Sequence, residues 1–258
     1  MPIHSTAIID PNARIPDSCD IGPYCVIGPE VELGEKCRLV SHVHIEGPTR
    51  IGNNVRIFPF TSVGMAPQDL GYAGEPTRLE IGDDNEIREF VSINRGTIKG
   101  GGTTRVGSNI LIMAYTHIAH DCQIGDHAIL ANAATLGGHV IVEEWAVVGA
   151  LCPVHQFVHI GAHSYIGGGT TITRDVLPFS KTAAARDTHA YGVNSVGLER
   201  RGFSKDRIAK IHHAYKVLLA SKLNTSQAIE KLKSESDSGE DAAMLIRFIE
   251  ASERGVIK

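Results

Sequence analysis

Aliphatic residues recur at every sixth position along most of the chain. From Val106 to Ile172 each member of this series is Val, Ile or Leu, and a small or β-branched residue stands four places after each. Because strand side chains alternate with a period of two, both sets point to the same side of a strand, and six residues make one short strand and one turn. An α-helix would rotate such a stripe by about 240° per repeat and spread it around its surface. The pattern therefore predicts a parallel β-helix built from hexapeptide repeats.

The same period opens the chain and is interrupted twice. It runs in register from Ile9 to Val63, stops across residues 64–80, returns, and stops again across residues 94–105 before it re-enters one residue out of phase at Val106. We therefore predict two loops that leave a single solenoid. Loops on a rigid scaffold commonly carry function, which makes the Asp69 region of the first loop a candidate site.

The composition changes from hexads to a helical pattern near the end of the chain. Ser204 can cap a helix whose apolar residues follow helical spacing, and two more helices can begin near Thr225 and at Asp241. We predict a hexapeptide β-helix over residues 1–190 and a C-terminal α-helical domain over residues 191–258.

The repeat alone does not fix the handedness or the assembly of the β-helix. The general rule for parallel crossovers predicts a right-handed coil, whereas known hexapeptide proteins are left-handed, and we expect a left-handed β-helix. The flat side faces of a β-helix are open surfaces that commonly pair with copies of themselves. We expect a homotrimer.

Composition and charge narrow the functional classes. Of the 258 residues, 42% are hydrophobic and only 5% aromatic, which suits a core of stacked aliphatic side chains. A net charge of -4 argues against nucleic acid as a general partner.

No signal segment or membrane span is evident, so we expect a cytoplasmic protein. All five cysteines fall at interior positions of hexads, where we expect small buried side chains rather than disulfides or metal ligands.

One row of residues has the chemistry of acyl transfer. If three hexads form one coil, residues 18 apart are stacked about 4.8 Å from each other, and counting from His120 reaches Gly138 and then Gln156. A histidine can act as a general base on a hydroxyl, and the N–H of Gly138 can donate to a developing oxyanion. Asp121 can orient the imidazole. His117 and His139 lie near the same edge.

A second group of histidines resembles a metal site only at first sight. His155, His159 and His163 are spaced four apart, as zinc ligands on a helix would be. On hexads, however, they point in three different directions. We therefore expect no metal site from these residues.

Several motifs resemble those of the UDP-N-acetylglucosamine O-acyltransferases that begin lipid A synthesis, and the match runs nearly end to end. The motifs are Gln68-Asp69-Leu70, Gly74-Glu75-Pro76-Thr77-Arg78, His117-Ile118-Ala119-His120-Asp121-Cys122, Gly138-His139, Val154-His155-Gln156-Phe157, Ile160-Gly161-Ala162-His163 and Arg200-Arg201-Gly202-Phe203. Together with the helical tail they are specific to that family, whereas hexads alone occur in many acyltransferases.

The resemblance implies transfer of a 3-hydroxyacyl chain from acyl carrier protein to the 3-position of UDP-N-acetylglucosamine, with no cofactor and no metal. It implies that His120 is the general base and that the Gly138 N–H stabilises the oxyanion. It places acyl-chain selection at Gly168. The residues that it implies for contacts with the substrates are Gln68, Asp69, His117, His139, His155, Gln156, Asn194, Arg200 and Arg201.

Three positions depart from the family pattern. Gly71 stands where many members have Lys, Asn94 where His is common, and Val196 where a Glu is usual. These changes touch the expected sugar pocket, so the 3-amino analogue of the sugar nucleotide, which would give an amide, stays open as the acceptor. Two further functions are compatible with a β-helix. One is a trimeric γ-type carbonic anhydrase, which stoichiometric zinc would reveal, and the second is a non-catalytic scaffold, which leaves the row of His120 unexplained.

Overall fold

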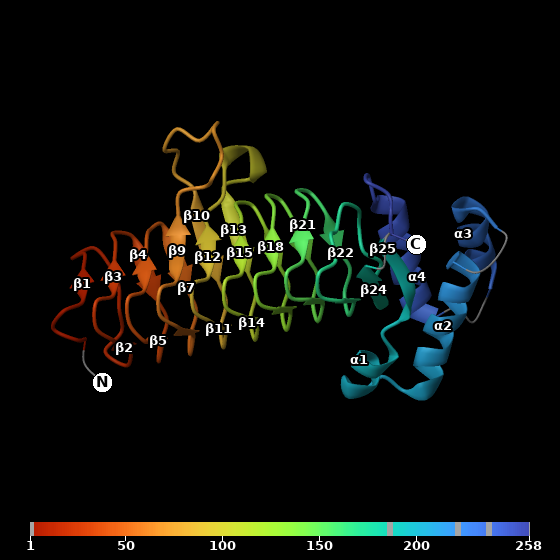
Figure 1. Cartoon of the computed structure of the whole chain (residues 1–258), viewed down its shortest axis with the longest axis horizontal. Coiled ribbons are helices and arrows are strands. Elements are labelled where there is room, and N and C mark those ends of the chain that lie inside the picture. Colours follow the sequence, from red (N-terminus) through yellow and green to blue (C-terminus); the bar gives the residue numbers. More distant parts are fainter. Residues whose placement is uncertain (1–2, 185–187, 220–222, 236–238, 258) are drawn as a thin grey trace.

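The computed structural model describes residues 3–184, 188–219, 223–235 and 239–257. Short parallel strands form three sheets, and every third strand along the β-helix belongs to the same sheet (Figure 1). Sheet A contains β1 (Ile8–Ile9), β3 (Val26–Ile27), β6 (His44–Ile45), β9 (Ser62–Met65), β12 (Ser92–Asn94), β15 (His117–Ile118), β18 (Thr135–Leu136) and β21 (Pro153–Val154). Sheet B contains β4 (Val31–Leu33), β7 (Thr49–Ile51), β10 (Arg78–Ile81), β13 (Thr103–Val106), β16 (Gln123–Ile124), β19 (Ile141–Val142) and β22 (His159–Ile160). Sheet C contains β2 (Asp20–Ile21), β5 (Arg38–Leu39), β8 (Arg56–Ile57), β11 (Glu86–Ile87), β14 (Leu111–Ile112), β17 (Ile129–Leu130), β20 (Val147–Val148), β23 (Tyr165–Ile166), β24 (Ser180–Ala184) and β25 (Thr188–Val193).

The strand register confirms the predicted coil of 18 residues. His117 of β15 pairs with Thr135 of β18, which in turn pairs with Pro153 of β21. The chain passes from sheet A to sheet B to sheet C and back, so three edges run along the β-helix. We call them the A/B, B/C and C/A edges.

The repeated aliphatic residues fill the interior of the coil, as the sequence predicts. Ile118 and Leu130 are fully buried, and so are the neighbouring members of the series. All five cysteines are free and buried in the same interior, where their small side chains fit between larger ones. A second hydrophobic core lies among the C-terminal helices.

Both predicted loops leave the coil at the A/B edge. The first lies between β9 and β10 and the second between β12 and β13, where a short 3-10 helix spans Ile98–Gly100 (Figure 1). Each loop is shorter than its predicted range, because β9 continues to Met65 and β13 begins at Thr103. Both strands therefore include residues that the hexad pattern assigned to loops, and main-chain hydrogen bonds hold these residues in the sheets.

The C-terminal region contains more elements than the sequence analysis predicted. An antiparallel hairpin of β24 and β25 extends sheet C, and four helices follow it. These helices are α1 (Ser195–Arg200), α2 (Lys205–Leu219), α3 (Thr225–Ser234) and α4 (Gly239–Ala251). No helix in the described part of the chain is both long and apolar enough to cross a membrane.

The observed helix caps match the caps predicted from the sequence only in part. The Ser204 hydroxyl accepts from the N–H of Arg207 at 3.2 Å, which confirms the predicted start of α2. Helix α3 is capped instead by Asn224, which forms a reciprocal capping box with Gln227. Asn194 caps α1 by accepting from the Gly197 N–H at 3.3 Å.

Candidate active site

The predicted row of residues exists on the A/B edge. The His139 N–H donates to the His120 carbonyl at 3.0 Å, and the Phe157 N–H donates to the Gly138 carbonyl at 3.0 Å, so three successive turns are stacked. A Cβ on Gly138 would lie 2.6 Å from His120 Cε1, closer than real side chains approach. The imidazole therefore lies against the Gly138 backbone, and this contact requires glycine.

His120 and Asp121 form a hydrogen-bonded pair on this edge. His120 Nδ1 is 2.8 Å from Asp121 Oδ2, and the two side chains are 15% and 1% exposed. A carboxylate accepts a hydrogen bond from Nδ1–H, which leaves Nε2 with its lone pair available to take a proton. Within the described residues the N–H of Gly138 has no hydrogen-bond acceptor, so it can donate to a substrate oxygen next to this imidazole.

Two further histidines, His139 and His117, lie near the pair, and burial lowers the pKa of both. His139 Nε2 lies 3.6 Å from Asp121 Oδ2, and its ring packs edge-on against His120. Burial lowers the pKa of His139, an effect that the nearby Asp121 carboxylate opposes. Burial also lowers the pKa of His117, with a contribution from His120, and its Nδ1 is 2.7 Å from the Ser92 hydroxyl.

The first loop brings Asp69 toward this edge. The charge of the Asp69 carboxylate favours the protonated form of His139 and so opposes the lowering of its pKa by burial. The loop is anchored by Arg95, whose guanidinium donates to the carbonyls of Gly47 at 3.0 Å and Gly64 at 2.9 Å and to the Tyr72 hydroxyl at 3.1 Å. The sequence analysis missed Arg95, because no hexad position marks a residue that bridges a loop to two coils.

The structure locates the three departures from the family pattern. The position of a Cβ on Gly71 is 3.4 Å from Asp69 Oδ1 and 3.5 Å from the ammonium of Lys99, which comes from the second loop. Asn94 is buried and donates to the Ala66 carbonyl at 3.0 Å, so it supports the base of the first loop. Val196 is 60% exposed in the first turn of α1.

Three predicted substrate contacts lie elsewhere, at the B/C edge. Asn194 donates to the carbonyl of His163 at 3.1 Å, and the Arg201 guanidinium lies 5.3 Å from the ring centroid of Trp145. Trp145 and His163 both occupy turns between sheets B and C. Arg200 is the last residue of α1, whose cap is Asn194 and which Arg201 follows directly. One chain therefore does not bring Asn194, Arg200 and Arg201 together with His120.

The other residues predicted to contact the substrates lie at the A/B edge or in the first loop, whereas the residue predicted to select the acyl chain lies at the C/A edge. His155 and Gln156 lie in the A/B turn after β21, and both side chains are exposed. Gln68 is also exposed, in the first loop. Gly168 lies at the C/A edge, where an added Cβ would be 3.2 Å from the Ala150 carbonyl oxygen. The structure does not place Gly168 beside His120.

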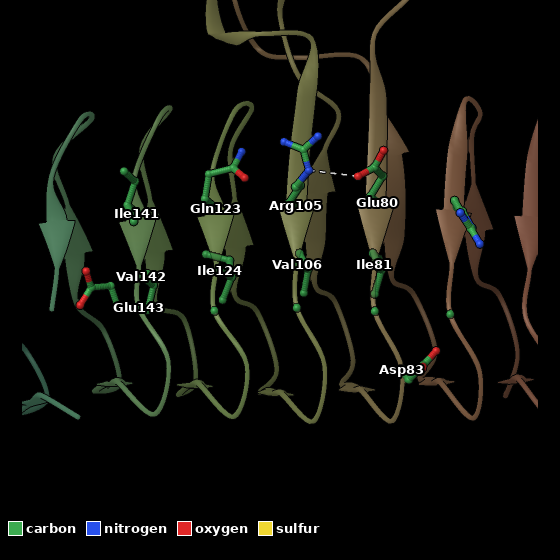
Figure 2. Close-up of a pocket in the computed structure, with 15 residues that line it drawn as sticks. Glu80, Ile81, Asp83, Arg105, Val106, Gln123, Ile124, Ile141, Val142 and Glu143 are labelled. Atoms are coloured by element: carbon green, nitrogen blue, oxygen red, sulfur yellow. Dashed lines mark hydrogen bonds and ion pairs between the residues drawn. The ribbon is translucent and has the colours of Figure 1, made fainter. Parts of the chain in front are cut away.

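The outer face of sheet B connects the two site edges. A shallow hollow of about 630 Å³ runs across several coils, and Figure 2 shows Glu80, Arg105, Gln123 and Ile141 in one outward row along it. A second groove, of about 760 Å³, begins at Asp121 and reaches the end of α4. Sheet B is thus the surface across which residues of the two edges would have to meet.

Within the described part of this chain, the His155, His159 and His163 side chains do not converge on one point. His159 pairs with Glu143 at 2.8 Å, and His163 stacks on Phe179, so the structure confirms that the 155, 159 and 163 side chains diverge. Among the described residues, His120, Asp121 and His139 offer ligand atoms within 4.8 Å of one another. In this trio the atom of His120 that faces the carboxylate is already used in its hydrogen bond to Asp121.

Comparisons with known proteins agree with this architecture. Residues 175–257 match the model of the UDP N-acetylglucosamine O-acyltransferase domain 2, and residues 103–138 match the bacterial transferase hexapeptide repeat. The acyl-(acyl-carrier-protein)–UDP-N-acetylglucosamine O-acyltransferase of Thermodesulfovibrio yellowstonii is 50% identical over 256 residues, covering 99% of each chain. That of Herminiimonas arsenicoxydans is 49% identical over 260 residues, again covering 99% of each.

Solved structures of UDP-N-acetylglucosamine acyltransferases also match this chain over nearly its whole length. The Acinetobacter baumannii enzyme superimposes with a TM-score of 0.95 at 47% identity and covers 99% of each chain. The Francisella novicida UDP-N-acetylglucosamine acyltransferase superimposes with a TM-score of 0.96 at 39% identity and covers 99% of this chain and 94% of its own. With relatives this similar over its whole length, the chain belongs to the acyl-(acyl-carrier-protein)–UDP-N-acetylglucosamine O-acyltransferase family.

Proposed function

We propose that this chain transfers a 3-hydroxyacyl group from acyl carrier protein to the 3-position of UDP-N-acetylglucosamine, the first step of lipid A biosynthesis. The observation that carries the proposal is the His120–Asp121 pair packed against the backbone of Gly138. An imidazole beside an unpaired amide donor can supply the base and the oxyanion donor that acyl transfer to a hydroxyl requires.

In this mechanism His120 Nε2 removes the proton from the sugar hydroxyl as its oxygen attacks the thioester carbonyl. The Gly138 N–H donates to the oxygen of the tetrahedral intermediate. When the intermediate collapses, the carbon–sulfur bond breaks and His120 returns the proton to the sulfur, so the products are the ester and free carrier thiol. Asp121 holds the ring in the required tautomer and stabilises the imidazolium.

Residues around this pair are suited to hold the sugar nucleotide. His139 packs against His120, and Asp69 and Gln156 offer further polar groups from the first loop and from the A/B turn after β21. Hydrogen bonds from such groups to hydroxyl groups of a sugar give orientation as well as affinity. We assign Gln68, His117 and His155 to the same binding region, since they lie on the A/B edge or in the loop that leaves it.

We propose that the site is completed in a homotrimer of left-handed β-helices. Asn194, Arg200 and Arg201 lie at the B/C edge, and His120 lies at the A/B edge, on opposite sides of sheet B. In a closed three-fold ring the B/C edge of one copy can face the A/B edge of the next. The guanidinium groups would then meet the diphosphate of the nucleotide or the acidic carrier protein.

The direct test is His120→Ala. The residue lies outside the stacked core, so the variant should keep its fold, while its turnover should fall by at least about a hundredfold. Turnover is measured with a defined acyl-carrier thioester and UDP-N-acetylglucosamine. His44→Ala serves as the control, because His44 points outward from β6 on sheet A and pairs with Glu46. A His120→Ala enzyme with wild-type turnover would remove this residue from the mechanism.

The 3-amino sugar nucleotide is the second candidate acceptor. The Asp69 loop lacks a side chain at Gly71, and Val196 presents an exposed apolar group where the family pattern has a carboxylate. A neutral amine needs less help from a base than a hydroxyl does, so His120 can serve either acceptor. Mass spectrometry of products formed from both nucleotides under matched conditions decides between them. Much slower turnover of the amine would rule it out as the preferred substrate.

A further inference from the structure

The second loop rests on the carboxylate of Asp121. The Thr97 N–H donates to Asp121 Oδ1 at 2.8 Å, and the Thr97 hydroxyl donates to Oδ2 at 2.6 Å. Oδ2 is also the acceptor for His120 Nδ1 at 2.8 Å. Both Thr97 and Asp121 are buried, at 4% exposure each. A chain of hydrogen bonds therefore runs from the loop through the carboxylate to the imidazole.

The Thr97 hydroxyl donates to the carboxylate and also has a second partner. The Gly100 N–H donates to the Thr97 hydroxyl oxygen at 3.2 Å. A lone pair of the hydroxyl oxygen accepts from this amide, and because an ionised carboxylate oxygen can only accept, the single hydroxyl proton is donated to Asp121 Oδ2. The hydroxyl thus remains a donor to the carboxylate and does not compete with it for the proton of His120.

Gly100 closes the other side of the carboxylate. An added Cβ at this position would lie 2.0 Å from Asp121 Cγ and 2.2 Å from Oδ1, so a side chain at residue 100 and the carboxylate cannot occupy the same place. Gly101 and Gly102, which follow it in the loop, have nothing within 4 Å of their Cβ positions. Close contact is therefore specific to Gly100 within this run of glycines.

We propose that Thr97 and Gly100 form a clamp that fixes the carboxylate of Asp121, and through it the ring of His120, for proton transfer. Thr97 is a positioning residue in this proposal, which rests on the assignment of His120 as the base. Among the described residues, His139 Nε2 also approaches the carboxylate, at 3.6 Å from Oδ2, while the Thr104 hydroxyl accepts from the Asp121 backbone N–H at 2.7 Å. Neither replaces the donor that Thr97 gives to Oδ2.

The decisive pair of variants is Thr97→Val and Thr97→Ser. Valine keeps the shape and the backbone N–H of threonine but removes the hydroxyl, whereas serine keeps the hydroxyl. We expect Thr97→Val to lower kcat about tenfold or more with little change in KM, because the buried carboxylate loses one donor and its fixed orientation. Thr97→Ser should remain close to the wild type.

The pH profile separates positioning from a purely structural role. A carboxylate with one donor fewer attracts the imidazolium of His120 more strongly, so the acidic limb of kcat/KM in Thr97→Val should move to higher pH. A variant that was merely less stable would keep the limb of the wild type. Thr97→Ser should keep that limb as well.

Gly100→Ala tests the other half of the clamp. The added methyl should push the loop off Asp121 and reduce kcat by a similar factor. Gly101→Asn is the matched control, because asparagine tolerates the left-handed backbone found there and meets no neighbour. Equal rate losses in both variants would show a general sensitivity of the loop and would overturn the role of Gly100.

The proposal can fail independently of the proposed function. If Thr97→Val kept the wild-type kcat and pH limb while His120→Ala was inactive, the clamp would be refuted and the base would stand. If Thr97→Ser lost as much activity as Thr97→Val, the hydroxyl would have no part in positioning. If His120→Ala kept its turnover, the assignment of the base would fail and the clamp would lose its purpose.

Discussion

At Gly138 and Gly100 a neighbouring side chain occupies the space that a Cβ would need, so both positions require glycine. At Gly138 the neighbour is the imidazole of His120, and at Gly100 it is the carboxylate of Asp121. The backbone is thereby brought against both members of the pair. A spacing of 18 residues in the sequence predicted the first of these contacts. The second depends on how two loops of irregular length pack, which no periodicity encodes.

We expect the buried His163, in a turn at the B/C edge, to make the stability depend on pH. Burial, together with the cations Arg201 and Arg207, lowers the pKa of His163 to about 4, compared with 6.5 for the free side chain. The unfolded chain therefore binds the proton first as the pH falls, so the free energy of unfolding decreases from pH 6.5 downward until about pH 4. Between pH 7 and pH 5 we expect His163 to account for a loss of about 2 kcal/mol.

Urea denaturation at the two pH values measures this effect. The variant His163→Gln cannot take up the proton, so its stability should decline less over the same interval by about that amount. Carboxylates elsewhere in the chain titrate equally in both proteins and cancel in the comparison. Parallel pH dependence of the two proteins would mean that His163 is protonated in the folded state.

Gly168 gives a prediction about acyl-chain length. The absence of a side chain in this exposed turn leaves the surface open, which we expect to admit a donor of about twelve to fourteen carbons. Gly168→Met should fill that space and shift the preference to a shorter donor, because each buried methylene is worth about 0.8 kcal/mol. Competition among donors of about ten, twelve and fourteen carbons measures the ranking. An unchanged ranking would mean that the acyl-chain groove lies elsewhere. Tyr165, which is 39% exposed and lies nearby, is the residue that could shorten the groove.

At the scale of elements, the hexads predicted the β-helix because each strand repeats the same short-range pattern. The hairpin of β24 and β25 escaped prediction since its antiparallel pairing, such as Ser180 with Val193, has no fixed period. Helix α1 escaped for a different reason. It has only six residues, and its cap is Asn194, which the resemblance had assigned to the substrate. Short elements held by tertiary contacts leave little trace in local sequence.

The stacked core of the strands predicts a large cost for truncation. Ile118 of β15 is fully buried beneath the turn that carries His120, so Ile118→Ala should lower the free energy of unfolding by roughly 2–5 kcal/mol through the cavity it leaves. Ile8→Ala, at a position that is 68% exposed in β1, is the control and should cost less than about 1 kcal/mol. Equilibrium denaturation measures both. A harmless Ile118→Ala would contradict the packing of the interior.

At the scale of the whole molecule, the separation of the two site edges predicts complementation between inactive chains. His120→Ala lacks the base on the A/B edge, and Arg200→Ala lacks a guanidinium on the B/C edge. If each site joins the A/B edge of one copy to the B/C edge of another, mixed trimers contain some sites with both groups intact. Random assortment at equal amounts should restore about a quarter of the wild-type activity.

The experiment unfolds and refolds the two variants together and assays the mixture. Refolding each variant alone and then mixing gives the control, which should stay inactive as long as the trimers do not exchange subunits. Arg200→Ala that is active by itself would show that Arg200 is dispensable. If both variants are inactive alone, failure of the mixture to recover activity, with trimers present by light scattering, would mean that Arg200 and His120 serve the same copy.

The turn that carries the site also repeats along the coil. Asp121, His139 and Phe157 all adopt a left-handed backbone, with φ of 62°, 62° and 65° at equivalent positions of successive coils. A functional group can therefore be moved by one coil through two substitutions 18 residues apart, with no change in the path of the main chain. On such a scaffold, equivalent positions recur at every coil. A new specificity can therefore arise when a side chain moves to the next coil, without any change in the length or path of a loop.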